Sequence, residues 1–212
     1  MTKELKKRLK EFEKSVYNTM RKISKEYGYK IISNSLYKIS GDFFLHGVFF
    51  TRIDQDKLKV FIRMYAKSYK SDDIFWTIFD MKENISQKES LRANGAFVAP
   101  SIQFSETWFE ISNLEACENI CRLAIEKFIE EEKRFLESIN GDVSQLMAYI
   151  SEHQGMMNEM LIKMLVAIQL GDYQTALKMA KDELEIGKRG CFQNNGKDIY
   201  EYTVDYCLKK HK

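Results

Sequence analysis

Two neighbouring segments decide the fold that we predict: "DFFLHGVFFTRI" (residues 42–53) and "KLKVFIRMYAKSY" (residues 57–69). Both are rich in aromatic and branched residues, which favour β-strands. In the second segment, residues 58, 60, 62 and 64 alternate with residues 59, 61, 63 and 65, so the two sets would face opposite sides of a sheet. Because only a short Asp-Gln-Asp turn separates the segments, we expect an antiparallel pair.

Three more segments have the composition of strands: 29–40, 73–81 and 101–111. Together with the first two, they predict an antiparallel sheet of about five strands. Residues 82–100 are polar, contain Asn94-Gly95, and predict a long loop or a hairpin tip between the last two strands. Loops of this length are uncommon unless they are functional or disordered, so we expect a ligand site on the sheet to lie beside this loop.

Helical periodicity flanks the predicted sheet. Residues 3–27 carry apolar side chains at steps of three and four, and Gly28 would end this helix. After the sheet, Ser112 or Asn113 would cap a helix that runs to about Ile139, and further helices are predicted near 143–152, 156–169, 173–187 and 197–210. The apolar positions of the first helix are Leu5, Leu9, Phe12, Val16, Met20, Ile23 and Tyr27.

This order predicts an α+β fold with an N-terminal helix, an antiparallel sheet of about five strands and a helical C-terminal half. We expect an α+β domain over residues 1–150, followed over residues 151–212 by a helical hairpin and a terminal helix. These last helices would pack on the first domain or form a small subdomain of their own.

The composition is that of a globular protein, with 44% hydrophobic and 30% charged residues and a single proline. No uncharged run approaches the roughly 18 apolar residues of a membrane helix. The first 16 residues are charged throughout and lack the apolar core of a signal peptide. We therefore expect a cytoplasmic protein that does not enter a membrane.

Charge is distributed unevenly along the chain. Residues 1–70 contain 17 Lys and Arg against 7 Asp and Glu, whereas residues 71–160 contain 7 against 17. The two segments could simply attract each other, or the basic segment could meet nucleic acid, a phosphate ligand or an acidic protein. For the second interpretation, the candidate anion-binding residues are Lys59, Arg63 and Lys67.

The aromatic residues of the predicted sheet also have two interpretations. They could form a platform on which bases stack, close to the three candidate cations. They could equally fill the core beneath the helices, as aromatic residues on strands usually do. The residues concerned are Phe43, Phe44, Phe49, Phe50, Phe61, Tyr65, Tyr69, Phe75 and Trp76.

Residues that could carry catalysis or bind metal form no recognisable motif. Cys117 and Cys121 lie on the apolar stripe of a helix, where cysteine behaves as a small core residue, and their spacing differs from that of structural zinc sites. Of the three histidines, we expect His46 to pack in or beside the sheet, and His153 and His211 to lie in a helix break and the terminal tail. We therefore predict no catalytic residue, metal or cofactor, and lean towards a protein that is not an enzyme.

Acidic residues cluster at three places. Asp54/Asp56 and Asp72/Asp73 fit turns, in which Asp hydrogen-bonds backbone groups. The run of glutamates at residues 130–132 fits a solvated helix face beside Lys127 and Lys133.

Several short phrases carry a family resemblance. Gly28-Tyr29-Lys30, Leu36-Tyr37-Lys38 and Gly41-Asp42 precede a hydrophobic strand, and a strand containing Trp108 precedes a long helix. In these features, residues 5–147 resemble an uncharacterised bacterial family, domain of unknown function 4304. That resemblance implies a fold, and no activity. The roughly 60 residues that follow depart from the family's pattern.

The C-terminal part contains "LGDYQTALKMAKDEL" (residues 170–184), which resembles the turn and second helix of a tetratricopeptide repeat. Gly171, Tyr173 and Ala176 match that motif, whereas Met164 and Lys188 depart from it. Because arrays need three or more repeats, we predict one tetratricopeptide-like hairpin near 156–187. The methionines of this region could pack the hairpin, or they could form an exposed surface. Surfaces rich in methionine bind partners adaptably, so the candidate partner-binding residues are Met156, Met157, Met160, Met164 and Tyr173.

These patterns favour a cytoplasmic protein-interaction module that binds another protein, or a second copy of itself, through its C-terminal helices. The alternative is binding of nucleic acid or a phosphate ligand through the basic first 70 residues.

Overall fold

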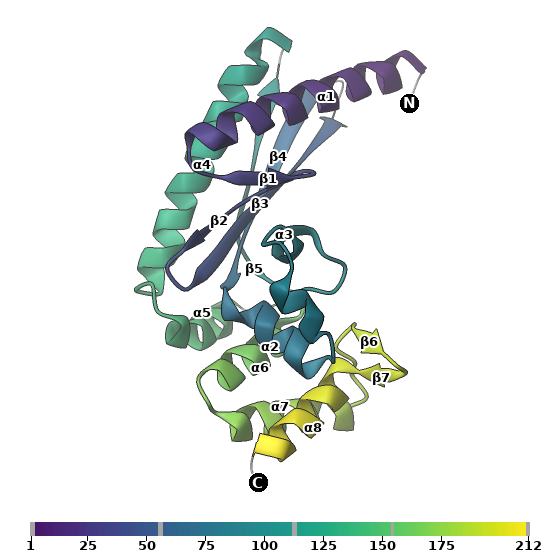
Figure 1. Ribbon diagram of the computed structural model, residues 1–212. Coiled ribbons are helices and arrows are strands. Elements are labelled where there is room, and N and C mark those ends of the chain that lie inside the picture. The colour runs from purple at the N-terminus through teal and green to yellow at the C-terminus, as the bar shows by residue number, and fades with distance from the viewer. Residues whose placement is uncertain (1–2, 55–56, 112–113, 154, 211–212) are drawn as a thin grey trace. The chain divides into compact units, whose positions relative to one another are not determined.

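The computed structural model describes residues 3–54, 57–111, 114–153 and 155–210 of the 212-residue chain (Figure 1). It has the predicted α+β fold, with an N-terminal helix, a five-stranded antiparallel sheet and a helical C-terminal half. The elements up to the sheet's last strand are α1 (Lys3–Glu26), β1 (Lys30–Ile32), β2 (Ser35–Ser40), β3 (Phe43–Asp54), β4 (Lys57–Ser68), α2 (Lys70–Ile78), the 3-10 helix η1 (Lys82–Ser86), α3 (Leu91–Asn94) and β5 (Ile102–Ile111). They are followed by η2 (Leu114–Ala116), α4 (Cys117–Ser138), η3 (Val143–Gln145), α5 (Leu146–Glu152), α6 (Glu159–Gln169), α7 (Tyr173–Glu185), β6 (Gln193–Asn194), β7 (Lys197–Asp198) and α8 (Ile199–Lys210).

The chain divides into two compact units. Unit 1 comprises Met1–Ser40, Leu45–Ala66 and Gln103–Glu137, and unit 2 comprises Gly41–Phe44, Lys67–Ile102 and Ser138–Lys212. These bounds differ from the predicted division at residue 150. The reason is the packing of α2, because Phe75 and Trp76 share a hydrophobic core with Leu161 and Leu165 of α6.

Unit 1 contains the sheet, whose strands follow the order β1-β2-β3-β4-β5. The two long helices α1 and α4 pack with the sheet around one core (Figure 1). As the periodicity predicted, α1 contributes one stripe of apolar side chains to this core; the side chain of Leu5 lies outside the described residues. Buried members of the core include Phe12, Val16, Met20, Val60, Ile62, Cys121, Ala124 and Phe128.

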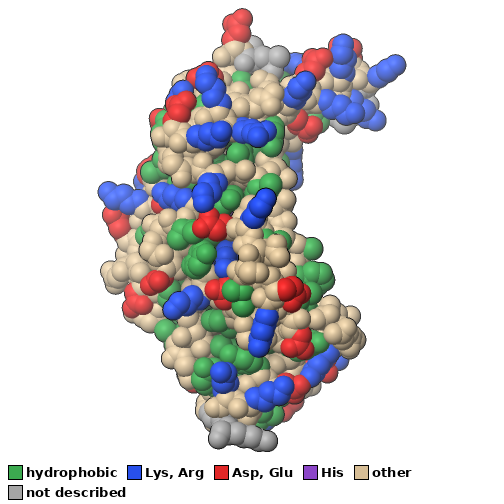
Figure 2. All heavy atoms as spheres, in the orientation of Figure 1, with side chains coloured by type: hydrophobic (Ala, Val, Ile, Leu, Met, Phe, Trp, Pro, Cys, Tyr) green, Lys and Arg blue, Asp and Glu red, His purple; other side chains and the backbone are tan. Residues whose placement is uncertain are grey.

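Lysine and arginine side chains gather on the N-terminal turns of α1, as Figure 2 shows. These turns contain Lys3, Lys6, Lys7, Arg8 and Lys10, all of which are exposed. Part of the positive charge that the sequence places in residues 1–70 therefore lies at this end of α1.

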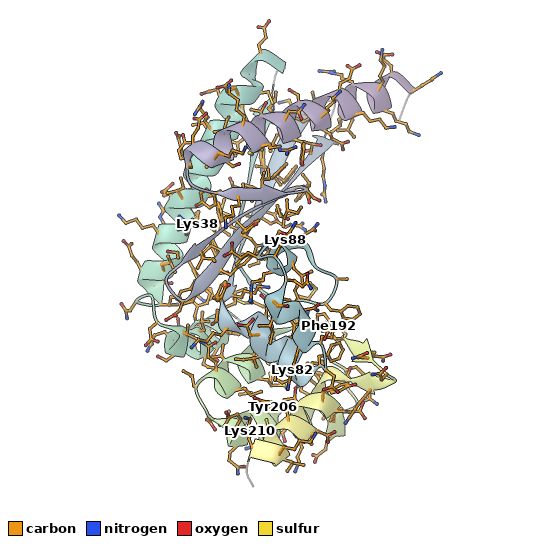
Figure 3. The ribbon with its side chains drawn as sticks, in the orientation of Figure 1. Lys38, Lys82, Lys88, Phe192, Tyr206 and Lys210 are labelled. Atoms are coloured by element: carbon orange, nitrogen blue, oxygen red, sulfur yellow. The ribbon has the colours of Figure 1, made fainter. Side chains whose placement is uncertain are left out.

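A buried carboxylate joins α4 to the first two strands. Glu132 accepts a hydrogen bond of 2.6 Å from the Tyr29 hydroxyl and forms an ion pair of 2.7 Å with the Lys38 ammonium group, whose position Figure 3 labels. Burial, and then the charge of Glu132, raises the pKa of Tyr29 far above its ordinary value. Glu132 is 5% exposed, so the expectation of a solvated face holds for Glu130 and is wrong for Glu132, while the side chain of Glu131 is half-buried.

The strand predicted for residues 73–81 is wrong, because this segment belongs mainly to helix α2. Its aromatic residues fit a period of 2 and a period of 3.6 equally well. In the structure, Phe75 and Phe79 are one helical turn apart, and their ring centroids lie 5.2 Å from each other. The main sheet nevertheless has five strands, since the segment 29–40 folds into two strands joined at Ser33, which has a positive φ of 50°.

Residues 82–100 follow a helix, and they contain η1 and α3, so the hairpin-tip interpretation is wrong as well. The helices predicted after the sheet are present as α4 to α8, and the small hairpin β6–β7 was not predicted. The predicted caps Ser112 and Asn113 lie outside the described residues. Among the helices that the structure describes, none is long and apolar enough to cross a membrane.

Candidate functional site

The outer face of the sheet in unit 1 carries a row of aromatic side chains from three adjacent strands. Phe50 of β3 stacks on Phe61 of β4, with ring centroids 5.1 Å apart and an interplanar angle of 4°. The Phe61 centroid lies 6.4 Å from that of Trp108 on β5. Phe50 and Phe61 are half-buried, whereas Trp108 is 50% exposed. The row therefore offers ring surface to an external molecule.

Three cations lie against these rings. The guanidinium carbon of Arg52 is 5.0 Å from the Phe50 centroid and 5.6 Å from that of Phe61. The Arg63 guanidinium carbon is also 5.0 Å from the Phe50 centroid, and the Lys59 ammonium nitrogen is 4.2 Å from the Trp108 ring. Such cation–π contacts hold long basic side chains close to the sheet. We call this set the aromatic–cation surface; it comprises Phe50, Arg52, Lys59, Phe61, Arg63 and Trp108.

Carboxylates at the same face partly neutralise these cations. Glu106 binds the Arg63 guanidinium at 2.6 Å, and Asp54 binds the Lys59 ammonium group at 2.5 Å. The hydrogen bond that Arg63 donates to Glu106 is the main reason that the pKa of Arg63 is raised above its ordinary value. The Arg63–Glu106 pair is exposed, and such pairs are worth only about 0–1 kcal/mol, so an external anion can replace Glu106. The Lys59 side chain is only 13% exposed, so its pair with Asp54 is more enclosed.

The sequence predicted part of this surface. Lys59 and Arg63 lie on it, and Arg52 and Trp108 were missed. The alternation of side chains along a strand could have identified Arg52 and Trp108, because both occupy outward positions beside Phe50 and Phe61. Of the other aromatic candidates, Tyr65 stacks on His46 with centroids 5.0 Å apart and Tyr69 lies beside Arg92, whereas the side chains of Phe43, Phe44, Phe49, Phe75 and Trp76 are buried.

Lys67 does not lie on the surface, and its assignment as an anion-binding residue is wrong. Its side chain is 1% exposed, and its ammonium group donates to Asp72 Oδ1 at 2.8 Å and to the backbone oxygens of Arg92 and Ala99 at 3.0 and 3.2 Å. These acceptors use all three ammonium protons. Burial lowers the pKa of Lys67, and the charge of Asp72 opposes this shift.

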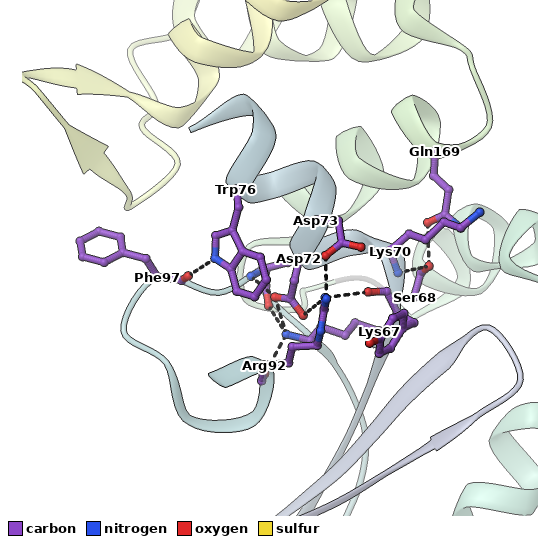
Figure 4. A network of polar contacts seen from close by, with 11 residues as sticks. Lys67, Ser68, Lys70, Asp72, Asp73, Trp76, Arg92, Phe97 and Gln169 are labelled. Atoms are coloured by element: carbon purple, nitrogen blue, oxygen red, sulfur yellow. Dashed lines mark hydrogen bonds and ion pairs between the residues drawn. The ribbon is translucent and has the colours of Figure 1, made fainter. Parts of the chain in front are cut away.

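Around Lys67 lies a buried ionic network, formed by Lys67, Asp72, Asp73 and Arg92 within unit 2 (Figure 4). Asp72 Oδ1 also accepts the backbone N–H of Ala99 at 2.8 Å, and Arg92 donates to Asp73 at 2.6 Å. The network therefore fastens residues 92–99 to the start of α2. Its charges are paired with one another, although Asp72 Oδ2 has only the Arg92 guanidinium at 3.5 Å and no hydrogen-bond partner, and this mutual pairing indicates a structural role.

The methionine candidates separate into exposed and buried residues. Met157 is 84% exposed just before α6, and Met156 and Met160 are half-buried beside Tyr200, where they line a hollow of about 380 Å³. Met164 has no exposed surface and belongs to the core of unit 2. Its assignment as a partner-binding residue is therefore wrong for this fold.

The last partner candidate, Tyr173, is half-buried at the start of α7, and its ring centroid lies 6.3 Å from that of Tyr206. Tyr173 is therefore separate from the hollow lined by Met156 and Met160. Whether the α6–α7 hairpin is tetratricopeptide-like stays a prediction.

The cysteines and histidines form no metal site in the part of the chain that the structure describes. Cys117 and Cys121 are buried as predicted, with sulfur atoms 4.0 Å apart. The hydrogen bond from Cys121 is the main reason that the pKa of Cys117 is lowered to about 6. His153 stacks on Tyr149 at the end of α5, and His211 lies outside the described residues.

Comparison of the chain with family models, with curated proteins and with solved structures found no match. The resemblance to domain of unknown function 4304 therefore stays a prediction.

Proposed function

We propose that the protein binds single-stranded nucleic acid on the aromatic–cation surface of unit 1. The observation that carries this proposal is the row formed by Phe50, Phe61 and Trp108, with Arg52, Lys59 and Arg63 against the rings. Single-strand binders combine aromatic rings, on which bases stack, with cations that follow the phosphate backbone. Both components occur here on one sheet face.

Binding would proceed by exchange of contacts. Bases would stack on the exposed ring of Trp108 and on neighbouring ring surface, where each stacked base is worth about 1–3 kcal/mol. Phosphate would replace Glu106 at Arg63, since exposed ion pairs are weak and exchangeable. The cations at the end of α1 add a positive field that attracts a polyanion to the same unit.

Trp108 supplies the test, because it is the exposed one of the chain's two tryptophans and Trp76 is only 1% exposed. A labelled single-stranded oligonucleotide should bind, quench the emission of Trp108 and dissociate as salt rises from about 50 to about 200 mM. Trp108→Ala should weaken binding about 5- to 150-fold, the equivalent of about 1–3 kcal/mol.

Leu123→Ala is the matched control, because Leu123 is an exposed apolar residue of the same unit on α4 and lies outside the surface. It should bind like the wild-type protein. The absence of binding at low salt, or equal binding by Trp108→Ala and Leu123→Ala, would contradict the proposal. Oligonucleotides of RNA and DNA should be compared in the same assay.

A second proposed function is the binding of a protein partner near the start of α6. It is supported by the exposure of Met157 and by the hollow that Met156 and Met160 line. Met157→Ser and Met160→Ser together should abolish co-purification of that partner with the full chain, whereas Leu208→Ser, at another exposed apolar position of unit 2, should not. Equal recovery with all variants would exclude this role.

Both proposals describe a cytoplasmic binding protein without catalytic activity. Cell fractionation with an antibody against the chain tests the location.

A further inference from the structure

Unit 2 contains a hollow of about 550 Å³ whose rim is basic. It lies between the carboxyl end of α2, the first residue of η1, strand β7 and one face of α8. Its volume falls within the range of about 300–1,000 Å³ that is typical of small-molecule sites. We call it the lysine pocket, and the side chains that matter to the argument are Lys82, Lys197, Lys209, Lys210, Tyr202 and Tyr206.

Helix α8 presents its residues to the pocket at helical spacing. Tyr202, Tyr206 and Lys210 follow one another at steps of four, so they lie along one face of the helix. Figure 3 labels Tyr206 and Lys210, which belong to α8, and Lys82, which begins η1. Cations from separate elements of unit 2 therefore meet at one hollow.

The lysines outnumber the acidic residues of the pocket. Asp80 and Asp205 are the carboxylates that line it, and Asp205 is paired with Lys197. Lys82 and Lys209 have no hydrogen-bond or ion-pair partner among the residues that the structure describes. Two ammonium groups are therefore available to an anion at this site.

The dipole of α8 explains the position of only two of the four lysines in the pocket. Lys209 and Lys210 are favourable near the carboxyl end of a helix because they offset its dipole. Lys82 begins η1 and Lys197 lies on β7, so the same explanation does not apply to them. Like charges that converge in one hollow repel each other unless a bound anion compensates them.

Two aromatic rings complete the pocket. The Lys197 ammonium nitrogen lies 5.1 Å from the Tyr202 ring centroid, and the Lys210 nitrogen lies 5.6 Å from that of Tyr206. Tyr202 is 9% exposed and donates its hydroxyl proton to the backbone oxygen of Asn194, so it forms a fixed wall. Tyr206 is half-buried and leaves ring surface for a planar group.

We propose that the lysine pocket binds a nucleoside diphosphate or triphosphate. Lys82, Lys209 and Lys210 would contact the phosphates, because lysine binds phosphate as a mobile point charge. The base would stack on Tyr206. This site lies in unit 2 and is independent of the aromatic–cation surface of unit 1.

Calorimetric titration of the full chain with ADP, pyrophosphate and adenosine tests the proposal. ADP should bind most tightly, pyrophosphate more weakly and adenosine weakest. Lys82→Gln together with Lys209→Gln should weaken ADP binding at least about tenfold, whereas Tyr206→Leu should weaken the binding of ADP and leave that of pyrophosphate unchanged. The matched control is Lys88→Gln, since Lys88 is exposed in the 82–100 segment and does not line the pocket.

Several results would overturn the assignment. They are the absence of ADP binding, unchanged affinity in the Lys82→Gln/Lys209→Gln variant, and equal affinity for ADP and pyrophosphate. Trp108→Ala should bind ADP normally; a loss there would assign the nucleotide to the sheet of unit 1 instead. Circular dichroism of each variant checks that it folds, which is expected because the substituted lysines are exposed at their charged ends.

Discussion

The two units contain ion pairs of nearly equal length in opposite surroundings. On the sheet of unit 1, Arg63 and Glu106 are 2.6 Å apart with side chains 40% and 36% exposed. In unit 2, Lys67 and Asp72 are 2.8 Å apart with side chains 1% and 0% exposed. The first pair can exchange its partner for a ligand or water, whereas the second cannot lose a partner without leaving a buried charge. Distance alone therefore does not distinguish a binding surface from a structural network.

The largest expected effect follows from breaking the buried pair. Asp72→Ala should lower the free energy of unfolding by about 3–5 kcal/mol, because Lys67 would remain buried without its counter-charge. Urea denaturation measures it. The double variant Asp72→Ala/Lys67→Met should recover part of the loss, since it removes the uncompensated charge. A double variant less stable than Asp72→Ala would contradict this account.

A smaller effect is expected at the buried carboxylate of unit 1. Tyr29→Phe removes the hydroxyl that donates to Glu132 and keeps the ring, so the free energy of unfolding should fall by about 1–3 kcal/mol. The ion pair with Lys38 remains and limits the loss. Thermal denaturation measures the change, and Tyr17→Phe is the control at a half-buried ring of α1. Equal stability of the two variants would mean that the hydrogen bond contributes nothing.

Breaking the exposed Arg63–Glu106 pair should increase the affinity for nucleic acid, whereas breaking the buried contacts lowers stability. Glu106→Gln removes the carboxylate that competes with phosphate for Arg63. Affinity for a single-stranded oligonucleotide should therefore rise about two- to fivefold, the equivalent of about 0.4–1 kcal/mol, with little change in stability. Fluorescence anisotropy at low salt measures it. Weaker binding by Glu106→Gln would show that the carboxylate contacts the ligand favourably.

The smallest effect is expected at a fully solvated pair of α4. Lys133 and Glu137 lie 3.8 Å apart, with side chains 75% and 63% exposed. Lys133→Gln should change the free energy of unfolding by less than about 0.5 kcal/mol. A loss comparable to that of Asp72→Ala would remove the distinction between solvated and buried pairs on which the comparison depends.

Alternation along β4 shows how far sequence reasoning reaches. It correctly placed Lys59, Phe61 and Arg63 on the face opposite Val60 and Ile62. Lys67 has the same parity as Lys59, yet it is enclosed by Asp72 and the segment that contains Arg92 and Ala99. Alternation defines the side on which a residue lies. It carries no information about what covers that side, because the covering segment is distant in sequence.

Helix α2 shows a second limit. Phe75, Trp76 and Phe79 have the residue types of a strand, and packing against α6 and α8 selects the helix. A third limit concerns Trp108, because its distance from Phe61 depends on the register between β5 and β4. Local patterns predicted α1, α4 to α8, most strands and the fold class, whereas the candidate site depended on pairings between distant segments.

The division of the chain into units has a consequence for how the protein is made. The sheet of unit 1 is interrupted after Ala66, and its last strand and α4 follow only with Gln103–Glu137. At about 5–20 residues per second, a ribosome takes several seconds to make the intervening segment and the rest of the unit. During that interval β3 and β4 have emerged, but the edge of β4 lacks its partner β5, and the aromatic side chains of the sheet lack the cover of α4. The nascent chain is then most vulnerable to aggregation, and a chaperone that shields these strands would act before the second half of the protein exists.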